Sequence, residues 1–191
     1  MSKDLQIIEI PLVVDLDGTL IRSDLLYETA SQFILRSPWS VFKLPYWLSK
    51  RGISYLKAKL ALATNLDISS LPYNKSLLDW LRQQKASGRK IILATASNEA
   101  LACLVAKRLD IFDEVFGSSE FVNLKSTKKR DHLVDLYGEN GFDYIVNSGD
   151  DLPIWMCARK CYVVGPEGSF GHVIRRAQKQ IEFFSVDRSV N

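Results

Sequence analysis

The sequence lacks the features that mark secreted, membrane-spanning and metal-thiolate proteins. Its three cysteines, Cys103, Cys157 and Cys161, include no Cys-x-x-Cys pair, so neither a disulfide framework nor a thiolate zinc site is expected. No apolar run approaches the roughly 20 residues that cross a membrane. The first six residues, Met-Ser-Lys-Asp-Leu-Gln, lack the apolar stretch of a signal peptide. These absences predict a reduced, cytoplasmic protein.

A strong charge of either sign is also absent. The net charge is only +3, whereas nucleic-acid binding usually needs a concentrated basic face, so no nucleic-acid partner is expected. The short basic run from Lys125 to Arg130 is too isolated to change this expectation. With 191 residues, 47% of them hydrophobic, the chain can form one α/β domain, with or without a sizeable insertion.

The most informative stretch begins at Pro11, where three apolar residues run directly into Asp15 and Asp17. A short apolar run bounded by turn residues predicts a buried strand of a parallel sheet, and ligands bind beyond the carboxyl ends of such strands. Strand alternation places Asp15 and Asp17 on the same side. Because two close carboxylates repel each other unless a cation or a proton separates them, the pair predicts a metal site. The alternative is a strand that ends in an acidic turn.

The segment Asp15-Leu16-Asp17-Gly18-Thr19-Leu20 resembles motif I of the haloacid dehalogenase (HAD) superfamily, DxDGT[LV]. The match is specific, because two acids, a glycine and a threonine all fall at fixed offsets. The resemblance implies a Rossmann-like core and a phosphoryl-transfer reaction at this strand end.

Strand and helix patterns alternate along the chain, which predicts an α/β fold with a parallel sheet and helices on both faces. Strands are expected near residues 11–16, 90–95, 114–117, 144–147 and 161–164. Helices are expected near residues 24–34 (capped by Ser23), 53–63, 75–85, 98–109 (capped by Ser97), 126–137, from Asp151 onward and 169–180.

One interval is longer than this alternation requires. A βαβ unit needs about 30 residues, yet 74 residues separate Leu20 from Thr95, and the surplus has a helical pattern. We therefore predict a helical cap inserted at residues 23–87, over a core formed by residues 1–22 and 88–185. HAD enzymes of the C1 type carry their cap at this position.

Three further segments resemble the other HAD motifs. Thr95 ends the second strand, where its hydroxyl and the following N–H groups would bind phosphate; a simple helix cap is the alternative. Lys129 best fits the motif III lysine, with Lys128 as the second choice and a solvated basic turn as the alternative. In motif IV, Asp151 takes one acidic place, but Asn147 stands in the other, which predicts weaker metal binding.

The resemblance implies a Mg²⁺-dependent phosphatase with an aspartyl-phosphate intermediate. Asp15 would attack phosphorus, and Asp17 would protonate the leaving group and then activate water. The expected substrate-binding residues are Leu16, Asp17, Thr95, Ala96 and Lys129. The expected Mg²⁺ ligands are Asp15, the Asp17 backbone carbonyl, Asn147 and Asp151. A non-catalytic HAD-like module and a phosphotransferase remain as alternatives.

Segments such as Leu71-Pro-Tyr-Asn74 and Asp151-Leu-Pro-Ile-Trp155 look like the HAD domain that is fused in bacteria to a UbiA-type prenyltransferase. That similarity implies a prenyltransferase partner and a small phosphorylated substrate, such as a lipid-linked phosphosugar, at the inner face of the membrane. In the predicted cap, aromatic residues alternate with cations, which suits a membrane interface or an amphipathic ligand. The preferred interpretation is that the aromatics, namely Trp39, Phe42, Tyr46, Trp47 and Tyr55, form the core of the cap.

Overall fold

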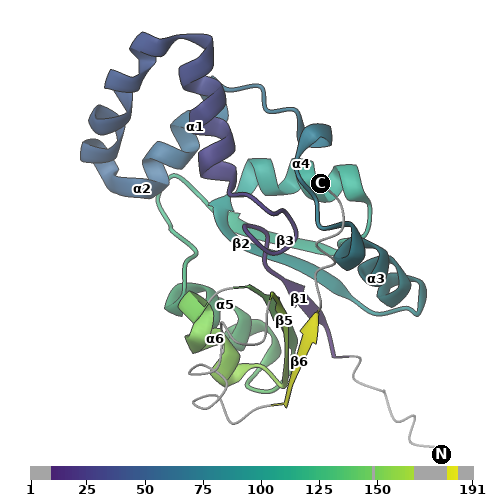
Figure 1. Cartoon of the computed structure of the whole chain (residues 1–191). Coiled ribbons are helices and arrows are strands. Elements are labelled where there is room, and N and C mark those ends of the chain that lie inside the picture. The colour runs from purple at the N-terminus through teal and green to yellow at the C-terminus, as the bar shows by residue number, and fades with distance from the viewer. Residues whose placement is uncertain (1–9, 148, 166–179, 185–191) are drawn as a thin grey trace, which may run out of the picture.

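The protein is built around a six-stranded parallel sheet with the strand order β3-β2-β1-β4-β5-β6 (Figure 1). The computed structural model describes residues 10–147, 149–165 and 180–184. The strands are β1 (Leu12–Val14), β2 (Ile91–Asn98), β3 (Glu114–Ser118), β4 (Asp143–Val146), β5 (Lys160–Val164) and β6 (Gln180–Phe184). The α-helices are α1 (Leu25–Arg36), α2 (Lys43–Ala63), α3 (Lys75–Ala86), α4 (Glu99–Leu109), α5 (Thr127–Tyr137) and α6 (Leu152–Cys157). Short 3₁₀ turns are η1 (Pro38–Phe42), η2 (Ile68–Ser70) and η3 (Gly149–Asp151).

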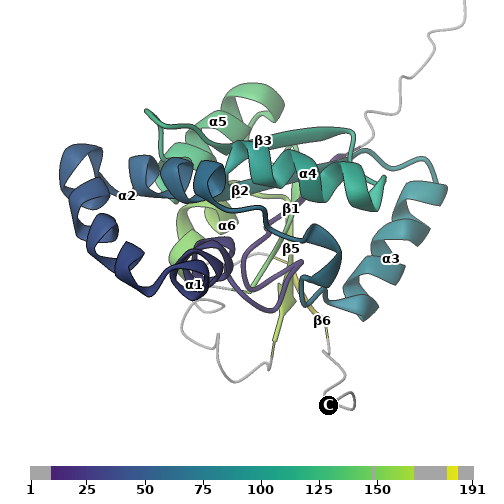
Figure 2. The same cartoon turned by 90° about the horizontal axis from the view of Figure 1, so that it is seen from above.

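Strand β1 lies at the centre of the sheet and is buried on both faces. Leu12 and Val14 belong to one hydrophobic cluster, which also contains Leu77 of α3 and Val105 of α4. Val13 points the other way, into a second cluster with residues of α5 and α6. Helices α3 and α4 therefore cover one face and α5 and α6 the other, as Figures 1 and 2 show. The predicted α/β fold with a parallel sheet and helices on both faces is confirmed.

Helices α1 and α2 and the turn η1 form a projection that stands away from the sheet (Figure 1). We call residues 25–63 the helical projection. It has its own small hydrophobic cluster, formed by Phe33, Leu56 and Leu60 with partly buried neighbours that include Trp47. Gly52 interrupts α2 with a φ of 76°, a conformation that glycine adopts readily and other residues avoid.

The expectation that the aromatic residues of this region fill its core is wrong for three of them. Trp39, Phe42 and Tyr46 are exposed, whereas Trp47 packs against Phe33 with a ring separation of 5.2 Å. The projection is a two-helix structure with a small core, so it has too little interior to bury every aromatic side chain that it carries.

Other differences from the expectations are local. Asp24, not Ser23, caps α1, and its carboxylate accepts hydrogen bonds from the N–H groups of Leu26 and Tyr27. Strand β2 continues to Asn98, so Asn98 rather than Ser97 caps α4. The helix expected at residues 169–180 lies outside the described residues except for Gln180, which begins strand β6, a strand that the sequence patterns did not predict. Among the described residues, no helix has the length and apolar character needed to span a bilayer.

Candidate active site

A pocket of about 250 Å³ lies at the carboxyl edge of the sheet, beyond β1 and β4. Parallel strands end at the same edge, which is why residues distant in the sequence meet there. The residues that line the pocket are Asp15, Asp17, Asp24, Lys57, Ala96, Lys125, Lys129, Asn147, Asp150 and Asp151. Five of the residues predicted for the site, together with the backbone neighbour Ala96, therefore surround one cavity.

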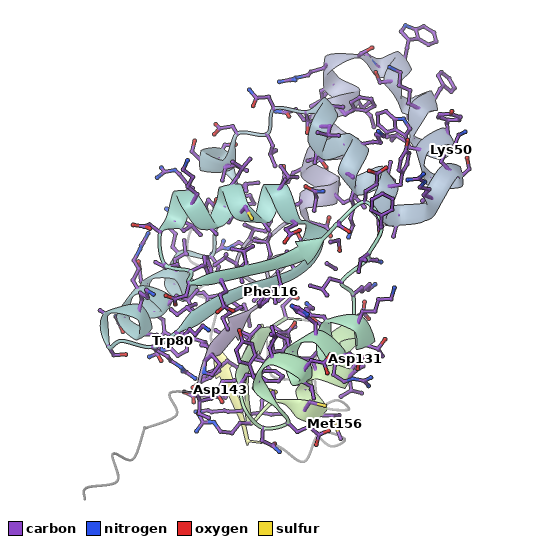
Figure 3. The ribbon with its side chains drawn as sticks, turned by 180° about the vertical axis from the view of Figure 1, so that it is seen from behind. Lys50, Trp80, Phe116, Asp131, Asp143 and Met156 are labelled. Carbon is purple, nitrogen blue, oxygen red and sulfur yellow. The ribbon has the colours of Figure 1, made fainter. Side chains whose placement is uncertain are left out.

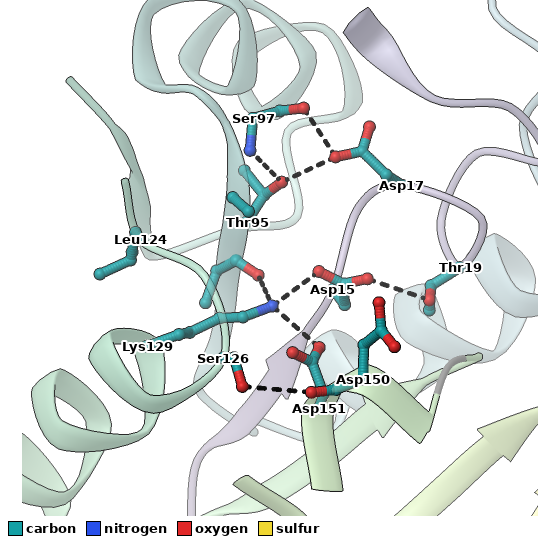
Figure 4. Close-up of polar contacts among 12 residues, drawn as sticks. Asp15, Asp17, Thr19, Thr95, Ser97, Leu124, Ser126, Lys129, Asp150 and Asp151 are labelled. Atoms are coloured by element: carbon teal, nitrogen blue, oxygen red, sulfur yellow. Dashed lines mark hydrogen bonds and ion pairs between the residues drawn. The ribbon is translucent and has the colours of Figure 1, made fainter. Parts of the chain in front are cut away.

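Lys129 lies at the base of this cavity, with only 1% of its surface exposed. Its ammonium group donates hydrogen bonds to Asp15 Oδ1 at 2.9 Å and to Asp151 Oδ2 at 3.1 Å (Figure 4). It donates a third to the Tyr144 hydroxyl at 2.9 Å. Lys128, the second choice from the sequence, is exposed. Lys129 is thus the lysine that enters the site. A buried ammonium group needs such partners, because an unpaired charge in the interior is costly.

Tyr144 was not predicted as a site residue. Its fully buried hydroxyl donates a 2.6 Å hydrogen bond to Asp151 Oδ2 and accepts one from Lys129. Burial and the neighbouring carboxylates raise its pKa far above the usual value, so the hydroxyl keeps its proton. Tyr144 lies in β4. In the sequence, a tyrosine in an apolar strand predicts only a buried core residue, so its place in the site could not be recognised.

The charges in this cluster perturb one another. Burial raises the pKa of Asp15 from its ordinary value of 3.8 to about 6, although the nearby Lys129 ammonium lowers it. For Lys129, burial lowers the pKa but the charges of Asp15 and Asp151 outweigh it, so the pKa is raised. Lys129 therefore stays charged, and a further cation near Asp15 would favour the ionised carboxylate.

Asp17 has a separate set of partners. Its carboxylate accepts hydrogen bonds from the Leu25 N–H at 2.9 Å, the Ser97 hydroxyl at 2.7 Å and the Thr95 hydroxyl at 3.1 Å. Figure 4 shows Asp17 directed toward Thr95 and Ser97, while Asp15 faces Lys129. Burial, followed by the negative charge of Asp24, raises the pKa of Asp17. The carboxyl group is therefore able to hold a proton closer to neutral pH than an exposed aspartate.

The expectation that strand alternation places Asp15 and Asp17 on the same side is wrong in its reason. Strand β1 ends at Val14, so Asp15 and Asp17 lie in the turn that follows it rather than on one face of an extended strand. The turn is closed by hydrogen bonds from the N–H groups of Thr19 and Ile21 to the Leu16 carbonyl. Both carboxylates nevertheless line the same pocket. The Leu16 side chain is fully buried in the core, so only its backbone is near the site.

Thr95 and Ser97 work together around Asp17. The Thr95 hydroxyl also accepts a 2.9 Å hydrogen bond from the Ser97 N–H. Ser97 was predicted as a helix cap, and its contact with Asp17 was missed. A serine two residues beyond the Thr95 position was a weak signal for this role, because serine before a helix is usually a cap.

Asn147 reaches the pocket beside Gly18. A Cβ atom built on Gly18 would lie 2.2 Å from Asn147 Nδ2, and Gly18 has a φ of +71°. Glycine at this position therefore serves two purposes: it permits the turn, and it leaves space for the Asn147 side chain.

The donor chemistry of the pocket fits a magnesium ion. The pocket walls offer the carboxylates of Asp15 and Asp151 and the amide oxygen of Asn147. Magnesium prefers oxygen ligands and keeps several waters, so a few protein donors suffice. Within the described part of the chain, no group of three or more His, Cys, Asp or Glu side chains is placed to hold a metal. The expected side-chain donors, two carboxylates and the Asn147 amide, carry less negative charge than three carboxylates would.

Lys57 of α2 is another residue that the sequence patterns did not assign to the site. Its ammonium group lines the pocket and donates a 2.7 Å hydrogen bond to the Ala96 carbonyl. Burial lowers its pKa, and the charges of Asp17 and Asp24 act in the opposite direction. Lys57 therefore adds a cation near Asp17 and Asp24, whereas Lys129 pairs with Asp15 and Asp151.

Comparisons with known proteins agree with this architecture. An uncharacterized protein from Sinorhizobium fredii (strain NBRC 101917 / NGR234), y4nM, is 35% identical over 182 residues, which are 95% of this chain. The chain spans only 35% of that relative's length.

Among solved structures, a protein of unknown function from Bordetella pertussis Tohama I matches with a TM-score of 0.67 at 14% identity, covering 91% of this chain and 98% of that one. A substrate-bound phosphoserine phosphatase matches with a TM-score of 0.59 at 13% identity, covering 91% of this chain and 93% of that one. At these identities the structural matches establish the fold. The sequence model of the haloacid dehalogenase-like hydrolases matches residues 12–144. The chain therefore belongs to the haloacid dehalogenase-like hydrolase family.

Proposed function

We propose that the protein is a Mg²⁺-dependent phosphatase that hydrolyses a phosphate monoester through an aspartyl-phosphate on Asp15. The observation that carries this proposal is the pairing of the buried Lys129 ammonium with both Asp15 and Asp151. The buried lysine fixes the orientation of Asp15 and places positive charge where a transferred phosphoryl group would be negative.

In the first half-reaction, a carboxylate oxygen of Asp15 attacks phosphorus. The bond between phosphorus and the leaving oxygen breaks, and protonated Asp17 gives its proton to that oxygen. The raised pKa of Asp17, caused by burial and by Asp24, supports this acid role. Thr95, Lys129 and the backbone near Leu16, Asp17 and Ala96 are the proposed contacts of the phosphoryl oxygens.

In the second half-reaction, the now ionised Asp17 takes a proton from a water molecule. The water oxygen attacks phosphorus, the bond from phosphorus to Asp15 breaks, and inorganic phosphate leaves with Asp15 as a free carboxylate and Asp17 protonated. Magnesium, when bound by Asp15, the Asp17 backbone carbonyl, Asn147 and Asp151, would neutralise charge on the phosphoryl group. The amide at Asn147 implies a weaker Mg²⁺ site than one with a third carboxylate.

The helical projection is proposed to act as a cap over the core. Helix α3 lies within the expected cap segment of residues 23–87, but it packs against the sheet and so belongs to the core. Lys57 supports the role of the projection as a cap, because it reaches from α2 to the Ala96 carbonyl of β2. The proposed substrate is a small phosphate ester, with a lipid-linked phosphosugar at the cytoplasmic membrane face as the specific candidate. Support for this candidate comes from the likeness of several segments to HAD domains fused to UbiA-type prenyltransferases, which also makes such an enzyme the proposed partner.

The decisive experiment compares the wild type with Asp15→Asn, using 4-nitrophenyl phosphate with Mg²⁺ and with excess EDTA. The wild type should release phosphate only with Mg²⁺, and Asp15→Asn should lose at least about 10³-fold in kcat, because the amide cannot act as the nucleophile. Asp135→Asn, an exposed acid of α5, is the matched control and should keep full activity.

A covalent readout separates the phosphatase from its alternatives. Acid-quenched wild type should carry phosphate on Asp15, and hydroxylamine should release it. Retained turnover in a correctly folded Asp15→Asn variant would refute the mechanism. If no phosphate is released with Mg²⁺ from aryl phosphates, sugar phosphates or lipid-linked phosphosugars, the protein is a non-catalytic module. This alternative is open because Asn147 stands where the motif has an acid.

A further inference from the structure

The outer end of the helical projection exposes a group of large apolar side chains. We call this group the tip surface; it consists of Leu35, Trp39, Val41, Phe42 and Tyr46. Leu35 is 82% exposed, Trp39 80% and Phe42 69%. These residues come from the end of α1, the turn η1 and the start of α2, which Figure 1 shows at the part of the projection remote from the sheet.

Side chains of the tip surface contact one another and a neighbouring lysine. The rings of Trp39 and Phe42 stack, with centroids 6.3 Å apart and planes 23° from parallel. The Lys50 ammonium lies 5.2 Å from the centre of the Tyr46 ring. Single exposed apolar side chains are common on soluble proteins. A group of them gathered at one place and rimmed by polar residues marks an interaction site.

The segment that carries the tip surface has charges of one sign only. From Thr29 to Leu66 the chain has no acidic residue, but it has six basic ones: Arg36, Lys43, Lys50, Arg51, Lys57 and Lys59. The other 19 basic residues share the rest of the chain with all 22 acidic residues. Positive charge is therefore concentrated on the helical projection, although the net charge of the protein is only +3.

Some of these cations flank the tip surface directly. Lys43 opens α2 next to Phe42 and is exposed. Lys50 lies at the outer edge of the projection in Figure 3. Lys57 does not contribute, because its ammonium group faces the pocket. The tip surface thus combines aromatic and aliphatic side chains with adjacent exposed ammonium groups.

We propose that the tip surface docks on a lipid bilayer that carries anionic headgroups. Aromatic rings favour the headgroup level of a bilayer, aliphatic side chains the acyl boundary, and lysines the anionic headgroups. Each basic residue near an anionic surface raises the partition coefficient about fivefold. This inference does not rest on the proposed phosphatase activity, because a catalytically inactive chain would dock equally well.

A second copy of the chain fits the tip surface less well. A symmetric dimer places the same patch against itself. Here that arrangement would bring cations against cations with no acid from Thr29 to Leu66 to pair with them. A nucleic acid would gain stacking on Trp39 and Phe42, but it would also cover the aliphatic side chains of Leu35 and Val41 without benefit.

The test measures sedimentation of the full chain with phosphatidylcholine vesicles that contain or lack phosphatidylglycerol. The wild type should bind the anionic vesicles and show little binding to pure phosphatidylcholine. Trp39→Ala/Phe42→Ala should lower the partition coefficient about tenfold or more. Lys43→Glu/Lys50→Glu should lower it about as strongly, and added salt should weaken wild-type binding.

Leu104→Ala is the matched control, because Leu104 is a half-exposed apolar residue of α4 outside the projection. It should bind vesicles like the wild type, and all variants should keep the wild-type melting temperature, since the substituted side chains are exposed. The proposal would be overturned if Leu104→Ala lost as much vesicle binding as Trp39→Ala/Phe42→Ala, or if the wild type did not bind anionic vesicles. A tip-surface variant that changes only the oligomeric state in sedimentation velocity or only the binding of an oligonucleotide would also overturn it.

Discussion

The Lys57 ammonium donates a 2.7 Å hydrogen bond to the Ala96 carbonyl and so joins helix α2 of the projection to strand β2 of the sheet. Both residues line the pocket that contains Asp15 and Asp17. The projection therefore contributes a charged side chain to the pocket. This contact makes Lys57 the residue through which the projection is expected to influence substrate binding.

Replacement of Lys57 should weaken substrate binding more than it slows the chemical step. In Lys57→Met the pocket loses a cation that faces the anionic substrate, so KM should rise about tenfold while kcat changes less. Lys59→Met is the control: Lys59 lies on the same helix, but its ammonium group stacks on Tyr55 at 5.0 Å, outside the pocket lining. Steady-state kinetics with an aryl phosphate measures KM and kcat for both variants. An unchanged KM in Lys57→Met, or an equal rise in Lys59→Met, would contradict this role.

Replacement of Lys129 should destabilise the fold as well as abolish activity. Lys129→Met leaves the buried carboxylates of Asp15 and Asp151 without their ammonium partner, and removing one partner of a buried ion pair costs about 3–5 kcal/mol. Lys128→Met, one residue earlier and exposed, should cost less than about 0.5 kcal/mol. Urea unfolding of the two variants tests the difference. Equal stability of both would show that the Lys129 pairs contribute nothing net.

Gly18 and Gly52 provide a matched pair of substitutions. Both have positive φ angles, +71° and +76°, so alanine strains the backbone at each, by about 1–2 kcal/mol. Only at Gly18 would the new Cβ collide with Asn147, whereas nothing lies within 4 Å at Gly52. Gly18→Ala should therefore also raise the Mg²⁺ concentration needed for half-maximal activity, and Gly52→Ala should not. A Mg²⁺ titration of both variants decides, and identical curves would remove Asn147 from the proposed metal site.

The Asp113 carboxylate should make stability depend on acid pH. Burial acts to raise its pKa, but hydrogen bonds from Lys85 and from the Ile91 N–H outweigh this, so the pKa is lowered from 3.8. An acid with a lowered pKa stabilises the fold above its unfolded pKa, and this contribution is lost as pH falls through the lower folded pKa. Because the group is about one-third exposed, the effect should be about 1 kcal/mol or less.

The comparison for Asp113 uses unfolding free energies of the wild type and Asp113→Asn from pH 7 down to pH 2.5. The wild type should be more stable at pH 7, and the two curves should converge below pH 3.8. Asp135→Asn, an exposed acid of α5, should leave the curve unchanged. A gap between wild type and Asp113→Asn that stays constant across this range would rule out the carboxylate charge as its cause.

The sequence determined the parallel sheet and much of the pocket. Apolar runs and helical periodicity are local properties, and parallel strands align their carboxyl ends at one edge. For this reason the sequence alone predicts that Asp15, Asp17, Thr95, Asn147 and Asp151 lie close together. Strand β6 was missed. The predicted helix reached only Gln180, and the polar–apolar alternation from Gln180 to Phe183 is at the lower limit of length for a strand signal.

Only the tertiary structure decided which side chains pair. Lys129 and Asp15 are 114 positions apart, and Ser97 and Asp17 are 80 apart, so local patterns do not encode these contacts. The same limit applied to Tyr144. The sequence already preferred Lys129 to Lys128, and the structure shows Lys129 buried and Lys128 exposed.

Exposure was likewise a tertiary property. Trp39 and Phe42 are large apolar residues of the kind that usually lie in a core, but here they are exposed. The helical projection has too little interior to bury them. The sequence thus determined where the candidate site residues gather, through strands that end at a common edge. The packing of distant segments determined their partners and left the tip surface open, because burial depends on what each side chain meets in space.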